Sequence, residues 1–82
     1  MKNPISRKEE QEKLDQLGNR LKHFRRLRGY GNYESFAYEH SITRTQYGRY
    51  ERGANIQFNT LLGLLKALDV TVEEFFSEGF DG

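Results

Sequence analysis

Three polar side chains, Arg44, Thr45 and Arg49, lie within a short stretch of helical periodicity. The forked guanidinium of arginine matches the O6 and N7 acceptors of guanine, and a threonine methyl can pack on the methyl of thymine. Tyr47 and Tyr50 are three residues apart and would turn to the inner face of such a helix. The outer face would then carry Arg44, Thr45, Gln46, Gly48 and Arg49. This pattern indicates a helix that could contact the edges of DNA bases.

A second helix and a tight turn come before this stretch and would set its direction. Asn32 is a good N-cap for a helix over residues 33–40, and Thr43 would cap the next helix, over residues 44–51. Gly53 is a natural end for that helix because it can take a positive φ. Two short helices joined by about three residues cross steeply, which is the helix-turn-helix arrangement. A small and an apolar side chain would fill the crossing and the turn, Ala37 and Ile42.

A long first helix is predicted to begin at Ser6, which forms a capping-box pattern with Glu9. A break near Gly18 is an open alternative because glycine weakens a helix interior, and Gly29 would end the helix. One apolar stripe recurs at steps of three and four residues: Leu14, Leu17, Leu21, Phe24 and Leu27. The opposite face would carry the basic side chains Arg20, Lys22, Arg26 and Arg28.

The C-terminal part predicts two further helices. Residues 58–68 are strongly apolar, and Asp69 follows them. Thr71 and Glu74 form a second capping-box pattern that opens a last helix through Phe76. The whole chain is therefore expected to be an all-α, five-helix bundle with the helix-turn-helix in its second and third helices. We expect residues 1–13 to extend the first helix, residues 14–78 to form the domain, and residues 79–82 to be a flexible tail.

Charge is distributed unevenly along the 82 residues. Residues 1–31 hold nine Lys or Arg and four Asp or Glu, a net of +5, whereas residues 54–82 hold one Lys and five acids, a net of −4. Such asymmetry suggests that one face meets a polyanion, although a chain that balances its own charge would look similar. The sequence has no cysteine, no apolar leader and no run long enough to cross a bilayer. A cytoplasmic protein with no membrane contact is therefore expected.

Three segments together resemble the phage repressor/Cro-type helix-turn-helix proteins, also called the xenobiotic-response-element (XRE) family. They are LGNRLKHFRRLRG, FAYEHSITRTQYGRYERG and NTLLGLLKALDVTVEEFF, which cover about residues 17–76. The resemblance implies a repressor-like five-helix fold whose third helix is the recognition helix. It also implies sequence-specific binding of double-stranded DNA and transcription regulation.

The same resemblance implies roles for individual residues. The base-contacting positions would be Arg44, Thr45 and Arg49. The positions that contact the DNA backbone or flank the base contacts would be Asn32, Tyr33, Thr43, Gln46, Arg52, Asn55 and Gln57. Arg25 and Glu51 match a pair that forms an internal salt bridge in the family. Three positions depart from the family pattern: Tyr33 replaces a usual Gln, Ser41 a turn Gly and His40 an inward apolar residue.

Other functions have less support in the residues. His23 and His40 lack the spacing of metal ligands, and the adjacent Glu73 and Glu74 diverge on a helix, so neither a metal, a cofactor nor an enzyme is expected. An antitoxin-like or adaptor protein that binds a protein partner is the alternative function. A homodimer is expected. Its surface would be the fifth helix with Phe75, Phe76 and Phe80, or else the first helix.

Overall fold

The longest helix, α1 (Arg7–Leu27), begins at a capping box. The backbone N–H of Glu9 donates to Ser6 Oγ at 3.1 Å, and the carboxylate of Glu9 accepts from the backbone N–H of Ser6. These bonds satisfy donors that the first turn of a helix leaves without partners. The computed structural model describes residues 3–81, and the predicted start of this helix is confirmed.

Four shorter helices follow α1: α2 (Tyr33–Glu39), α3 (Arg44–Glu51), α4 (Phe58–Leu68) and α5 (Val72–Phe76). The prediction of five helices is confirmed, and residues 3–81 contain no strand. The second helix ends one residue earlier than predicted, because His40 is its C-cap. Asp69 ends α4 in the left-handed region, at φ 56°, where glycine or asparagine would be commoner.

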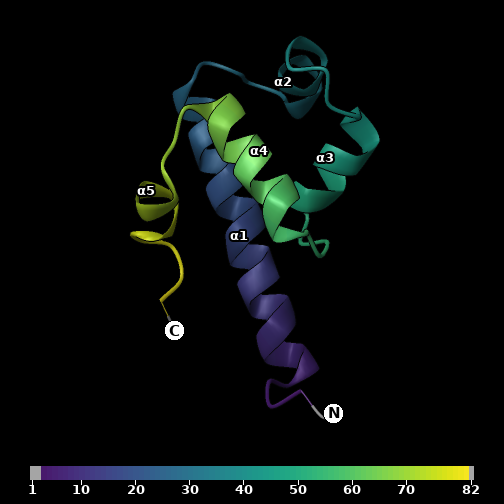
Figure 1. Ribbon diagram of the computed structural model, residues 1–82. Coiled ribbons are helices and arrows are strands. Elements are labelled where there is room, and N and C mark those ends of the chain that lie inside the picture. The colour runs from purple at the N-terminus through teal and green to yellow at the C-terminus, as the bar shows by residue number, and fades with distance from the viewer. Residues whose placement is uncertain (1–2, 82) are drawn as a thin grey trace.

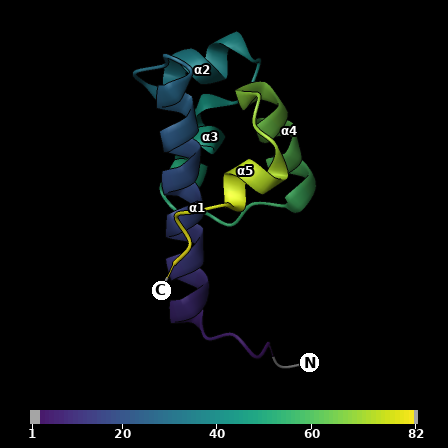
Figure 2. The same cartoon turned by 90° about the vertical axis from the view of Figure 1, so that its left-hand side faces the viewer.

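α1 is the spine on which the other helices pack. Figures 1 and 2 show α2 and α3 on one side of its upper half, α5 on another, and α4 between them. The N-terminal turns of α1 extend beyond this group of helices, in purple in both views. This extension explains a radius of gyration of 12.9 Å, which exceeds the roughly 11.7 Å expected of a compact chain of this length.

The core lies where the five helices meet. It is made of aliphatic and aromatic side chains that are almost fully buried: Leu21, Phe24, Phe36, Ala37, Tyr47, Leu61, Leu64, Leu65, Leu68, Val70 and Phe75. Aromatic rings are close to one another within it, with Phe36 and Tyr47 at 5.1 Å between ring centres. A core of this kind supplies most of the stability available to so small a chain.

The helix continues through Gly18 without a break, so the alternative considered for this position is wrong. Gly18 is buried against the end of α3. A Cβ atom at this position would lie 2.5 Å from the carbonyl oxygen of Glu51 and 2.7 Å from that of Tyr50. The glycine therefore allows the backbones of α1 and α3 to approach closely, and this packing compensates for its low helix propensity.

Two of the basic side chains expected on the outer face of α1 are engaged within the fold. Arg20 is 7 % exposed, and it donates to the carbonyl oxygens of Phe75 at 3.0 Å and Glu74 at 3.1 Å. The expectation that it lies in solvent is wrong, because the end of α5 offers carbonyl acceptors that need donors. Arg28 is exposed, but it donates to the carbonyl oxygens of Leu68 and Asp69 at 2.7 and 2.8 Å.

The C-terminal residues lie along α1. Lys13 Nζ donates to the carbonyl oxygen of Phe80 at 2.8 Å, and Gln16 Nε2 donates to that of Asp81 at 3.1 Å. Of the three phenylalanines expected at a dimer surface, Phe75 is fully buried in the core. Phe80 is half-buried against the same core, which leaves Phe76 as the exposed ring of the three.

Candidate nucleic-acid interface

The two faces of α3 differ in the way that the sequence predicts. Tyr47 is 0 % exposed and packs among the core side chains, and Tyr50 is half-buried against them. Arg44, Thr45 and Arg49 are exposed, and Gln46 beside them is half-buried. The helix is held by its inner aromatic face, and its polar side chains are free to contact another molecule.

Gly48 is an exception to the predicted outer face, because it is buried beneath the ring of Tyr33. A Cβ atom at position 48 would lie 2.8 Å from Tyr33 Cε1 and 2.9 Å from Cζ. Tyr33 is the first residue of α2, and its half-buried ring covers this point of α3. The tyrosine therefore packs the two helices together, while its position at the start of α2 keeps it at the edge of the polar face.

The connection between α2 and α3 contains a strained residue. Ser41 has φ 57°, in the left-handed region that disfavours residues with a Cβ atom. The backbone N–H of the next residue, Ile42, donates to the carbonyl oxygen of Ala37 in α2 at 2.8 Å. The side chain of Ile42 is half-buried against the core. Thr43 is the N-cap of α3, but its side chain makes no capping hydrogen bond. The first turn of α3 thus lacks the side-chain cap that the sequence predicts.

A buried ion pair joins α1 to the end of α3, between the two residues that the family resemblance implies. Arg25 Nε donates to Glu51 Oε2 at 2.7 Å, and Nη2 donates to Oε1 at 3.1 Å. The third nitrogen, Nη1, donates to the carbonyl oxygen of Tyr30 at 2.7 Å. The hydrogen bond to Glu51 raises the pKa of the Arg25 guanidinium above its ordinary value. A two-pronged pair of this kind fixes how α3 is set on α1.

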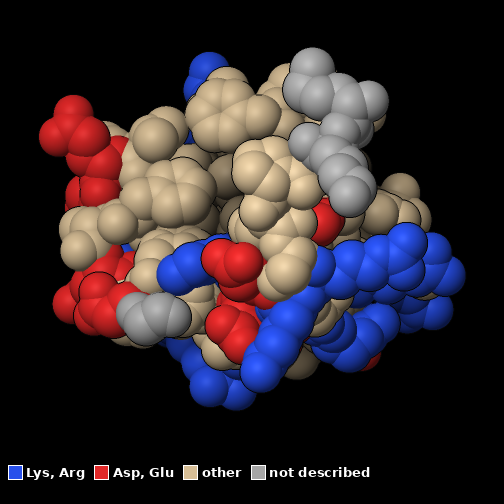
Figure 3. Space-filling model, turned by 90° about the horizontal axis from the view of Figure 1, so that it is seen from below, with Lys and Arg blue, Asp and Glu red and all other residues tan. Residues whose placement is uncertain are grey.

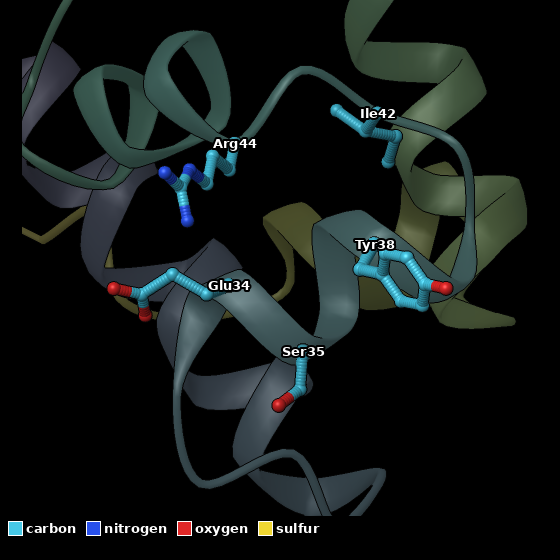
Figure 4. Close-up of a pocket in the computed structure, with 5 residues that line it drawn as sticks. All are labelled: Glu34, Ser35, Tyr38, Ile42 and Arg44. Atoms are coloured by element: carbon cyan, nitrogen blue, oxygen red, sulfur yellow. The ribbon is translucent and has the colours of Figure 1, made fainter.

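A pocket of about 420 Å³ opens between α2 and the start of α3. Its lining comes from both helices and from the turn between them: Glu34, Ser35, Tyr38, Ile42 and Arg44. Figure 4 shows the side chains of Glu34 on α2 and Arg44 on α3 leaving their helices toward the same side, with the guanidinium above the stem of Glu34. The pocket therefore combines a carboxylate acceptor and a guanidinium donor beside the exposed face of α3.

A second pocket, of about 340 Å³, lies on the other side of α2, where α1, α2 and α3 meet. The ion pair of Arg25 and Glu51 is part of its lining. Around that pair lie residues from three helices and the α1–α2 connection: Lys22, Arg26, Gly31, Asn32, Tyr33, Glu34, Gly48 and Arg52. Three cations, Lys22, Arg26 and Arg52, thus gather around one hollow.

Five of the seven predicted flanking residues divide into two groups, and the other two, Thr43 and Gln46, lie on α3 and its N-cap as described above. Asn32, Tyr33 and Arg52 are brought together in the second pocket, and Asn32 Oδ1 also accepts from the backbone N–H of Ser35 at 2.8 Å. Asn55 and Gln57 are exposed in the segment between α3 and α4, and neither lines these two pockets.

Sequence reasoning missed Glu34, which lines both pockets. Its one signal in the sequence was an acidic residue at the second position of the predicted helix, in the stretch between Arg28 and Arg44.

Charged side chains are unevenly spread over the face that Figure 3 draws. Lys and Arg lie mainly along its lower and right edges, and Asp and Glu lie at its left edge and also in small groups at its centre. Within residues 3–81, no group of three or more His, Cys, Asp or Glu side chains is placed to hold a metal ion. None of the helices in this described part has the length and apolar character needed to cross a bilayer.

Comparison of the chain with protein-family models, with curated proteins and with solved structures finds no match.

Proposed function

We propose that this chain is a sequence-specific DNA-binding protein of the XRE type, acting in the cytoplasm as a transcription regulator of the repressor kind. In this proposal α2 and α3 form the helix-turn-helix, and α3 is the recognition helix in the major groove. The proposal rests on the difference between the buried face and the exposed face of α3. Its Tyr47 is buried, while Arg44, Thr45 and Arg49 are exposed on a helix held firmly by the core.

The chemistry of the exposed face fits base edges. Thr45, Arg49 and Arg52 follow one another at four and three residues, so they lie along one stripe of α3 and its C-cap. Arg44 lies at the edge of this stripe, toward α2. A guanidinium that donates to both O6 and N7 of guanine contributes about 1–3 kcal/mol of discrimination against other bases. Two such arginines in one short helix suit the reading of a half-site.

The second pocket would hold the DNA backbone. Lys22 and Arg26 from α1 and Arg52 from the end of α3 surround it, with Asn32 and Tyr33 at the start of α2. Contacts between cations and phosphate set affinity and orientation but carry no base sequence. Separate groups of side chains would thus provide affinity and specificity.

The test is selection of binding sites from random duplexes, followed by measurement of affinity for the selected sequence. The double variant Arg44→Ala with Arg49→Ala should lose at least tenfold in preference for the selected site over a scrambled one, with unchanged helix content. The control variant Arg7→Ala with Lys8→Ala removes the same charge from the start of α1, which lies far from α3 (Figure 1), and should keep the preference. A preference retained by the first variant would refute the role of α3.

We further propose that the protein acts as a symmetric dimer. One copy presents only one reading helix, so the selected duplexes should contain two related half-sites about one helical turn apart. Selected duplexes with a single half-site would indicate a monomer.

Binding of a protein partner, as in an antitoxin or an adaptor, is the second candidate function. Exposed apolar side chains on α4 and α5 favour it: Phe58, Leu62, Val72 and Phe76. These residues could equally form the dimer surface. A partner that co-purifies at fixed stoichiometry, and that is lost when Phe58 and Phe76 are changed to Ser, would support this function over the dimer.

A further inference from the structure

Glu34 is an acidic residue in a basic neighbourhood. It is exposed at the first turn of α2, and it lines the pocket shared with Arg44 as well as the pocket that contains Lys22, Arg26 and Arg52. Within residues 3–81, the structure pairs it with none of these cations as an ion pair. Its carboxylate is therefore available at the point where the proposed base-reading and phosphate-binding surfaces meet.

A carboxylate at this place weakens binding to every duplex, because it repels phosphate groups. A hydrogen-bond donor on the target offsets that repulsion at one position in the base sequence. In the major groove the N4 amino group of cytosine and the N6 amino group of adenine are such donors. Cytosine fits this place better, because its partner guanine shows the O6 and N7 acceptors that suit Arg44, whereas the partner of adenine, thymine, shows the single acceptor O4.

The side chains of Glu34 and Arg44 extend from two helices into one space (Figure 4). An acceptor and a two-pronged donor side by side match the donor and the two acceptors that a guanine–cytosine pair shows in the major groove. We propose that Glu34 and Arg44 together read a single guanine–cytosine base pair, with Glu34 as the specificity-determining contact to cytosine. This inference rests on the proposed function, because it requires that the face of α3 enter the major groove.

The experiment is site selection with the full chain and with the single variants Glu34→Ala and Arg44→Ala. Both variants should relax the same base pair of the selected half-site, each with about a tenfold loss of discrimination between guanine–cytosine and adenine–thymine there. Glu34→Ala should also bind scrambled duplexes several-fold more tightly, because it removes a repulsive charge. Glu34→Gln should admit adenine at the cytosine position, since a glutamine amide can pair with adenine N6 and N7.

Glu73→Gln is the matched control. Glu73 is also exposed at the second position of a helix, α5, and it lies outside both pockets. Its variant should select the same bases as the unchanged protein. Circular dichroism of all variants checks that helix content is kept.

Four results would overturn the inference. Glu34→Ala could bind all duplexes more tightly with no change in the selected bases, which would show an electrostatic role only. It could relax a different base pair from Arg44→Ala, which would show independent contacts. If the unchanged protein selects no sequence at all, the proposed function fails too. If Arg44→Ala loses its preference but Glu34→Ala keeps it, the proposed function stands and this inference alone fails.

Discussion

Three buried polar side chains help to set the position of α3 and its exposed face: Tyr47, Arg25 and Glu51. The hydroxyl of Tyr47 is buried, with no hydrogen-bond partner in the described part of the chain. Burial, and to a lesser extent the nearby carboxylate of Glu51, raises the pKa of this phenol. The group is therefore a neutral hydroxyl next to the paired charges of Arg25 and Glu51. Replacement of either charge alone would leave the other buried without a partner, which is strongly destabilising.

The capping box of α5 makes a testable contribution to pH dependence. Hydrogen bonds from the backbone N–H and, next, the side chain of Thr71 lower the pKa of Glu74 below its ordinary value. A lowered pKa means that the stabilisation is present above the ordinary glutamate pKa, about 4.3, and is lost as the pH falls through the lower native value. We expect Glu74→Gln to be less stable than the unchanged protein at neutral pH, and the gap to close in acid.

Urea unfolding of both proteins between about pH 7 and pH 2 measures that gap. Glu73→Gln is the control, because Glu73 accepts no hydrogen bond among residues 3–81. A gap that stays constant down to the lowest pH would contradict the assignment of the effect to Glu74.

Among the helices, the close crossing of α1 and α3 has the clearest consequence. α3 is set on α1 by Gly18 and by the ion pair of Arg25 with Glu51. The carbonyl oxygens that face Gly18 belong to the backbone and cannot rotate away as a side chain would. Any residue larger than glycine at position 18 must therefore push α3 away from α1.

We predict that Gly18→Ala destabilises the protein by about 1–3 kcal/mol, because the added methyl group overpacks the crossing. Gly63→Ala is the matched control, since Gly63 also lies inside a helix but has no atom within 4 Å of an added Cβ. That control should gain up to about 1 kcal/mol from higher helix propensity. Thermal unfolding of the two variants measures the change in stability of each. If both changes had the same sign, the role of Gly18 in the crossing would be contradicted.

The molecule as a whole separates charge, and this separation governs how strongly it would bind a polyanion. The basic residues lie mainly in α1 and α3, while five of the six charged residues in positions 54–82 are acidic. On the face drawn in Figure 3, Lys and Arg are concentrated along the lower and right edges, although some Asp and Glu lie among them at the centre. Electrostatic attraction would therefore orient the molecule with α1 and α3 toward DNA before any base is read.

We predict that Lys22→Ala with Arg26→Ala weakens binding to all duplexes alike and leaves the selected bases unchanged. Removal of one cation from a phosphate group should lower the slope of log affinity against log salt by about 0.9, so the double variant should lower it by nearly 2. Titration of selected and scrambled duplexes at several salt concentrations measures both effects. A change confined to the selected duplex would instead indicate that these cations contact bases.

The sequence alone was sufficient to predict the positions of the five helices. Capping boxes at Ser6 and Thr71 and the periodicity of residues 44–51 predicted the helices to within a residue, because these signals act between neighbours in the chain. The inward direction of Tyr47 could be predicted for the same reason: a helix with one apolar stripe buries it.

Only the tertiary structure decided what the basic and glycine residues do. Arg20 and Arg28 look like solvent-facing cations in the sequence, yet they donate to carbonyl oxygens that lie at least 40 residues away along the chain. In the sequence Gly18 is a residue that weakens a helix, whereas in the fold it lets α1 and α3 pack closely. Glu34 becomes a candidate site residue only because the packing of the helices places it beside cations. Contacts between distant segments depend on how helices pack, and local sequence patterns carry no information on that packing.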